Sequence, residues 1–72
     1  MIKQYENLAN AIIELAAKDY IKALKKHKNH QYKKEYLYEM RSIENFFRSQ
    51  WYQSLTNVDG NMLIKKLKAE VM

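Results

Sequence analysis

Two histidines in this chain have a spacing that metal ligands use. His27 and His30 are three residues apart, and one continuous helix would bring both imidazoles to a single metal ion. Their neighbours are lysines rather than carboxylates, and the chain has no cysteine. Because a cluster of positive charge opposes a divalent cation, we expect surface histidines near a helix end and no metal site.

The sequence lacks the set of residues that covalent catalysis by side chains requires. A nucleophilic serine or threonine needs a base beside it and a third group that orients the base, whereas both histidines lie among lysines. The single glycine cannot build a phosphate-binding loop. We therefore expect a protein that is not an enzyme and that uses no cofactor and no small-molecule substrate.

Residues typical of binding surfaces recur at helical spacing in the middle of the chain. Steps of three, four, three and four residues would align them on one helix face, and we call them the Tyr/Arg row: Tyr38, Arg41, Asn45, Arg48 and Tyr52. Tyrosine and arginine are enriched at protein-binding hot spots and also stack on nucleic-acid bases. The row therefore predicts contact with a macromolecule, and its residue types fit a protein or a single-stranded nucleic acid about equally. For the chain as a whole we favour a protein partner over nucleic acid. The alternative is a structural role, in which a neighbouring helix covers part of the row.

Lysines are concentrated around the two histidines. The segment from Tyr20 to Lys34 contains six lysines and no acidic residue. We call them the lysine cluster: Lys22, Lys25, Lys26, Lys28, Lys33 and Lys34. Such a cluster stabilises the C-terminal end of a helix and promotes solubility. Alternatively it binds a phosphate backbone, without reading bases because it has no arginine. A DNA- or RNA-binding accessory protein that uses this cluster and the Tyr/Arg row is thus the second functional hypothesis.

The apolar pattern predicts three helices that would position these groups. Apolar residues recur at three- and four-residue steps over three segments, approximately 4–28, 32–55 and 57–70. The break between the first two is short, so these helices should pair as an antiparallel hairpin with the third packed across it. On the second helix we expect Phe47 and Trp51 to face the core, with the Tyr/Arg row on the outside.

The segment before the third helix resembles a helix cap. Thr56 and Asp59 form a Thr-x-x-Asp pattern, in which the threonine hydroxyl accepts a free backbone amide and the carboxylate lies at the positive end of the helix. Gly60, the only glycine, falls on the inward side of that helix. We expect a close backbone approach there, under Trp51.

Composition limits the class of protein. Seventy-two residues suffice for one domain with a thin core, and a chain with one glycine, no proline and no cysteine should be all-α and reside in a reducing compartment. No apolar run reaches membrane-spanning length, so we expect a cytoplasmic protein without a membrane partner. The net charge is +5, which favours polyanions at long range.

A thin core without disulfides favours association, so we expect a homo-oligomer, most simply a dimer. This expectation leads to a third functional hypothesis, a structural oligomerisation module. Its subunit contacts would be apolar side chains that the helix pattern leaves exposed, namely Tyr32, Phe46 and Met62.

Two stretches carry a resemblance to a known group of proteins. The run FFRSQWYQSLTNVDGNMLIKKL at 46–67, with AIIELAAKDYIKALKK at 11–26, resembles a family of small uncharacterised helical proteins of temperate phages and prophages of Gram-positive bacteria. The resemblance implies a bacterial host cell and a protein that binds a host or phage macromolecule, for example as an anti-CRISPR-like inhibitor of host defence. Inhibitors that mimic DNA are acidic, so this basic chain would instead bind an acidic protein surface or a nucleic-acid backbone.

Overall fold

The computed structural model describes the backbone of residues 2–71 and the side chains of residues 8–71. This part of the chain is all-α, which confirms the class predicted from the scarcity of glycine and proline. The helices in chain order are α1 (Ile2–Asn29), α2 (Lys34–Phe47), α3 (Gln50–Leu55) and α4 (Gly60–Val71).

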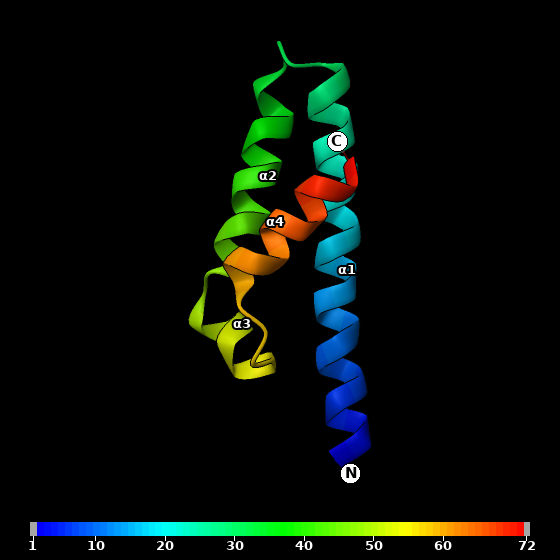
Figure 1. Cartoon of the computed structure of the whole chain (residues 1–72), viewed down its shortest axis with the longest axis vertical. Helices are drawn as coiled ribbons and strands as arrows, with labels where there is room; N and C mark the ends of the chain where they lie inside the picture. Colours follow the sequence, from blue (N-terminus) through cyan, green and yellow to red (C-terminus); the bar gives the residue numbers. More distant parts are fainter. Residues whose placement is uncertain (1, 72) are drawn as a thin grey trace.

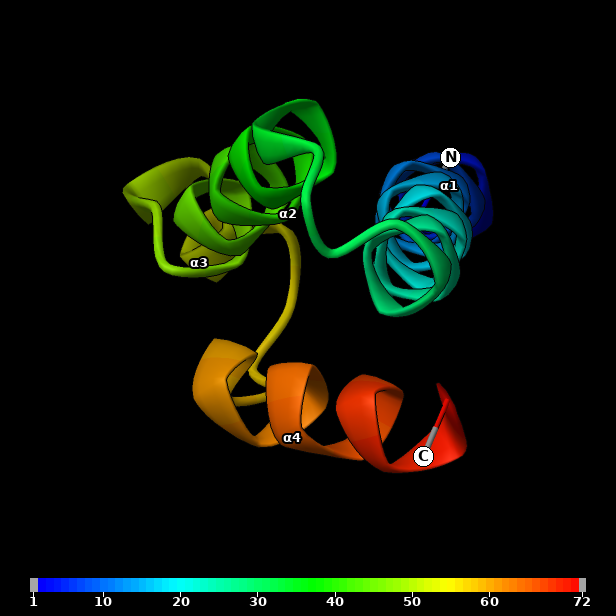
Figure 2. The ribbon, with the colours of Figure 1, turned by 90° about the horizontal axis from the view of Figure 1, so that it is seen from above.

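Two antiparallel helices form the frame of the molecule. A short connection at residues 30–33 joins α1 to α2, and α4 lies across one face of the resulting hairpin (Figures 1 and 2). The short helix α3 follows the end of α2, and α1 contacts each of the other three helices. The predicted hairpin with a short helix packed across it is therefore confirmed.

The core is small and receives side chains from every helix. Its buried members are Tyr20, Ala23, Met40, Phe47, Tyr52, Ile64 and Leu67. Phe47 lies at the centre of the aromatic part, with ring centroids 6.1 Å from Tyr20 and 5.5 Å from Tyr52, both edge to face. Because such contacts add to the burial of apolar area, this aromatic group is a major source of stability in so thin a core.

The predicted helix over 32–55 is wrong, because the helix begins at Lys34 and the chain leaves the helical conformation at Ser49. Ser49 is extended, with φ −80° and ψ 161°. Its hydroxyl donates to the Phe46 carbonyl at 2.6 Å and accepts from the Tyr52 amide at 3.1 Å. A serine that accepts an amide three residues ahead is an N-cap, so Ser49 ends one helix and begins the next.

This break changes which side chains of the following helix face the core. Tyr52 is buried, with 1% of its surface exposed, whereas Trp51 is 59% exposed. On one continuous helix Trp51 would have followed Phe47 onto the inner face and Tyr52 would have pointed outward. The predicted core position of Trp51 and the predicted outer position of Tyr52 are therefore both wrong.

The cap of α4 also differs from its prediction. The helix begins at Gly60 rather than near residue 57, and Asp59 caps it: its Oδ1 accepts from the Asn61 amide at 2.9 Å and its carbonyl accepts from the Leu63 amide at 3.1 Å. The Thr56 hydroxyl instead accepts from the Val58 amide at 3.2 Å, within the turn. Asp59, not Thr56, supplies the acceptors that the first turn of the helix needs.

Gly60 makes the close approach that its position predicts, but to a different neighbour. A Cβ atom at this residue would collide with the backbone carbonyl of Phe47. The contact therefore joins the start of α4 to the end of α2, and Trp51 is not the covering residue.

Candidate functional site

The first three residues of the Tyr/Arg row share the outer face of α2. Tyr38, Arg41 and Asn45 are exposed, on the side opposite the buried Met40 and Phe47. Among the described side chains, the hydrogen bonds and ion pairs of this helix involve Glu44 and Arg48 and none of these three. We call these three residues the α2 face.

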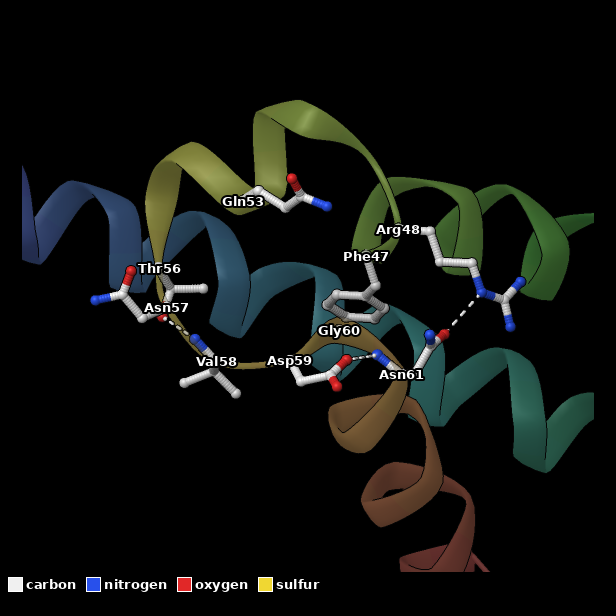
Figure 3. A pocket seen from close by; sticks show the side chains of 9 residues that line it. All are labelled: Phe47, Arg48, Gln53, Thr56, Asn57, Val58, Asp59, Gly60 and Asn61. Atoms are coloured by element: carbon white, nitrogen blue, oxygen red, sulfur yellow. Dashed lines mark hydrogen bonds between the residues drawn. The ribbon is translucent and has the colours of Figure 1, made fainter.

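Arg48 continues the row but is engaged within the molecule. Its Nε donates to Oδ1 of Asn61 at 3.0 Å (Figure 3). Its Nη1 lies 3.7 Å from Oε1 of Glu44. The first contact links the end of α2 to the start of α4. Arg48 thus borders the α2 face and also links α2 to α4 at the corner. A substitution there would therefore change the surface beside the α2 face and the packing of the corner at the same time.

Tyr52 does not belong to an accessible surface. Its ring packs edge to face on Phe46 and Phe47, with centroids 5.8 and 5.5 Å away. Its hydroxyl is buried and has no hydrogen-bond partner among the described residues. Burial, helped by the negative charge of Asp59, raises the pKa of Tyr52. The predicted partner-binding role of Tyr52 is wrong, because helix α3 turns this side chain inward.

An aromatic residue that the sequence assigned to the core is exposed instead. Trp51 lies on the surface with its ring edge to face on Phe46, at a centroid distance of 5.3 Å. The signal that could have revealed this is Ser49, a good N-cap in the middle of a predicted helix. Three apolar residues were expected to be exposed. Tyr32 and Met62 are exposed, whereas Phe46 is half-buried in the aromatic group.

A polar junction that the sequence did not predict lies behind the α2 face. Glu44, which is largely buried, accepts a hydrogen bond of 2.5 Å from the Tyr20 hydroxyl, and Nζ of Lys68 lies 3.8 Å from the same carboxylate. With Arg48 on its other oxygen, Glu44 connects α1, α2 and α4. Burial, with the Glu44 hydrogen bond and negative charge, raises the pKa of Tyr20 well above its usual value. The junction holds α2 at a fixed orientation.

The lysine cluster lies at the end of the hairpin where α1 meets α2. All six of its lysines are exposed, but several have neighbours that reduce their availability. Lys22 and Lys26 line an open cavity of about 380 Å³ together with Asp19 and Glu39. Lys28 Nζ donates to the Val71 carbonyl at 3.4 Å. The cluster is therefore bordered by one carboxylate of α1 and one of α2 and is not a uniform positive surface.

The two histidines do not converge. His27 is half-buried, and its Nδ1 has no hydrogen-bond partner among the described residues. It borders an apolar cavity of about 500 Å³ between the ends of α1 and α4. His30 lies beyond the end of α1, with its ring edge to face on Tyr32 at 6.0 Å. Residues 8–71 hold no group of three or more His, Cys, Asp or Glu side chains placed to bind a metal ion.

An open polar cavity of about 390 Å³ lies beside Arg48, where the segment after α2 turns into α4 (Figure 3). Its lining residues are Phe47, Arg48, Gln53, Thr56, Asn57, Val58, Asp59, Gly60 and Asn61. Most of the polar atoms there already serve the turn: Asp59 accepts from the Asn61 amide, Thr56 from the Val58 amide, and Asn61 from Arg48. The cavity is part of the helix corner and contains no nucleophile paired with a base.

Within the described part of the chain, no helix combines the length and the apolar character that crossing a membrane would require. Comparison of the chain with protein-family models, with curated proteins and with solved structures gives no match. The function must therefore be argued from the chain's own surface.

Proposed function

We propose that this chain is a small non-enzymatic binding protein that docks the α2 face onto an acidic surface of a protein partner. The observation that carries the proposal is the exposure of Tyr38, Arg41 and Asn45 side by side on one helix, with none of their polar groups engaged among the described residues. Tyrosine and arginine are enriched among the few residues that carry most of the binding energy at protein interfaces, where a flat ring and a guanidinium fork contribute area and paired hydrogen bonds.

Two further features support the proposal. The Glu44 junction fixes α2 against α1 and α4, so little conformational freedom would be lost when its outer face binds. The net charge of +5 attracts an acidic partner at long range and speeds encounter. The resemblance of 11–26 and 46–67 to proteins of temperate phages adds the context: a partner inside a bacterial host cell, with inhibition of host defence as the process served.

The test compares two charge reversals of equal size on different faces. Arg41→Glu changes the α2 face, and Lys65→Glu changes an exposed lysine of α4. Each tagged variant and the wild type would be used to capture proteins from a Gram-positive host lysate, with quantification by mass spectrometry. We expect a partner that is retained by the wild type and Lys65→Glu and lost with Arg41→Glu. Capture that is the same with all three chains would contradict the proposal.

Nucleic-acid binding is the second candidate, and the exposure of all six lysines of the cluster at one end of the hairpin favours it. It predicts binding to DNA or RNA that weakens steeply as salt rises, because each phosphate contact releases counterions. A gel-shift series with duplex and single-stranded probes, using Lys33→Glu with Lys34→Glu as the disrupted variant, tests it. The absence of a shift by the wild type at low salt would eliminate this function.

A further inference from the structure

The connection between α1 and α2 forms one end of the molecule and carries an aromatic group outside the core (Figure 1). The ring centroids of His30 and Tyr32 are 6.0 Å apart with the rings edge to face, and those of His30 and Tyr36 are 6.0 Å apart with the rings tilted by 43°. None of the three belongs to the core or packs against it. We call these three residues the tip aromatics.

Tyr32 is the most open of the tip aromatics. It is 78% exposed, the largest fraction among the large apolar side chains that are exposed in the described part of the chain. Its hydroxyl lies 3.4 Å from Nδ1 of His30, and the two rings are nearly perpendicular, at 88°. Because the hydroxyl is at the edge of the phenol ring, this contact leaves the faces of the ring free to receive another flat group.

The surroundings of Tyr32 are fixed by hydrogen bonds and ring contacts. The His30 amide donates to the Lys26 carbonyl at 2.8 Å, and the Lys33 amide donates to the His30 carbonyl at 3.0 Å. Nζ of Lys26 lies 5.7 Å from the ring centroid of Tyr36, a cation–π contact on the ring that supports His30. The turn is therefore formed before any ligand arrives, and little conformational freedom would be lost on binding.

Positive charge is concentrated around this ring. Residues 25–35 contain five lysines and one acidic residue, Glu35, a net charge of +4, whereas the whole chain has +5. Lys33 and Lys34 follow Tyr32 directly, and consecutive Cα atoms are only about 3.8 Å apart, so both ammonium groups can reach a ligand that lies on Tyr32. The tip of the hairpin thus combines an open aromatic ring with two adjacent, exposed lysines.

This combination indicates the chemistry of the ligand. Proteins that bind single-stranded nucleic acid stack bases on aromatic side chains and follow the phosphates with cationic ones. A protein partner fits the tip less well, because lysine is depleted at protein interfaces. A duplex also fits less well, because its bases are stacked on one another and offer no free face to Tyr32. The ligand that uses both the ring and the lysines is an unpaired strand.

We propose that Tyr32 is a stacking platform for an unpaired base of a single-stranded nucleic acid whose phosphates lie against Lys33 and Lys34. This inference rests on the second candidate function, nucleic-acid binding by the lysine cluster, and is independent of docking by the α2 face. It assigns base contact to a residue outside both the lysine cluster and the Tyr/Arg row. Because stacking uses the face of a base and not its edge, binding at the tip is tolerant of sequence.

Fluorescence anisotropy with two labelled probes tests the stacking contact. One probe is a thymidine oligonucleotide of about 12 nucleotides, and the other is a spacer chain with the same phosphates and no bases. We expect the wild type to bind the first probe about fivefold or more tightly than the second. Both affinities should fall as salt rises while their ratio stays nearly constant, because the two probes release the same counterions.

The two ways in which this test can fail are distinguishable. Equal affinity for the two probes would overturn the stacking platform and leave phosphate binding by the lysine cluster in place. Binding of neither probe at low salt would overturn the platform together with the second candidate function. Neither result bears on the α2 face, whose own test uses Arg41→Glu.

Three variants show whether Tyr32 is the residue that stacks. Tyr32→Phe keeps the ring and should bind the thymidine probe within about twofold of the wild type, whereas Tyr32→Leu should weaken binding about fivefold or more, to the level of the spacer probe. Trp51→Leu, at an exposed aromatic residue of α3, is the matched control and should change nothing. Circular dichroism confirms that each variant is folded. Unchanged binding by Tyr32→Leu, or an equal loss in Trp51→Leu, would overturn the proposal.

Capture from the host lysate separates this ligand from a protein at the same place. The partner retained by the wild type and lost with Arg41→Glu should still be captured by Tyr32→Leu, because the tip aromatics are not part of the α2 face. A captured protein that Tyr32→Leu loses, together with equal binding of the two probes by the wild type, would assign the tip to a protein and overturn the proposal.

Discussion

Individual residues at the helix corners decide how this short chain folds. Ser49 ends α2 and caps α3, Asp59 caps α4, and Gly60 lets the start of α4 approach the Phe47 carbonyl. Each of these residues acts through one or two backbone atoms rather than through area buried in the core. Substitutions there should therefore have effects much larger than the size of the side chains suggests.

Gly60→Ala should destabilise the fold by about 1–3 kcal/mol or more, the range seen when atoms are forced into a packed interior. The added Cβ would collide with the backbone carbonyl of Phe47, and a carbonyl cannot move aside as a flexible side chain can. Urea unfolding measures the change. Lys65→Ala, at an exposed position of the same helix, is the control and should change the stability by less than about 0.5 kcal/mol.

Tyr20 should make the stability sensitive to alkaline pH. Its pKa is raised in the folded state by burial and by Glu44, so the folded protein favours the neutral phenol. This contribution is fully present below the pKa of the unfolded tyrosine, about 10, and is lost as the pH rises above it. Thermal unfolding between pH 8 and 12 should show a steeper loss for the wild type than for Tyr20→Phe. Parallel curves for the two chains would refute this role.

At the scale of the helices, the structure differs from the sequence pattern in which side of α3 faces the core. Tyr52 is buried between Phe46 and Phe47, and Trp51 lies on the surface against one edge of Phe46. The interruption at Ser49 is the cause, since it resets the side of the helix that faces inward.

Tyr52→Ala should therefore cost about 3–5 kcal/mol, as expected for deleting a buried aromatic side chain, whereas Trp51→Ala should cost about 1 kcal/mol or less. Chemical denaturation of both variants measures the difference. The fluorescence of the single tryptophan provides a second measurement, with an emission maximum near that of a solvated indole in the folded protein. The reverse order of the two destabilisations would mean that residues 46–55 form one continuous helix.

The sequence predicts the long elements well and the corners poorly, for a physical reason. The apolar periodicity of residues 8–24 and 36–47 extends over several turns, so the hairpin and the outer positions of Tyr38, Arg41 and Asn45 follow from it. Ser49 interrupts the periodicity through one hydrogen bond, from the Tyr52 amide to its hydroxyl. The apolar pattern alone fits a helix with Trp51 inside as well as one with Tyr52 inside, and this cap decides between them. Glu44 could not be predicted as a junction, because its partners Tyr20 and Lys68 come from distant segments.

The whole molecule separates its surfaces along its length. The lysine cluster lies at one end of the hairpin, and the α2 face lies on the outer side of the hairpin.

The most direct test of this account is the affinity of the captured partner for the wild type, Arg41→Glu and Lys65→Glu, measured by calorimetry. We predict that Arg41→Glu weakens binding by about 30-fold or more, the effect of losing an interface hot spot, while Lys65→Glu changes it by less than about threefold. Equal weakening by the two variants would mean that net charge alone governs binding. That result would contradict the assignment of the α2 face as the docking surface.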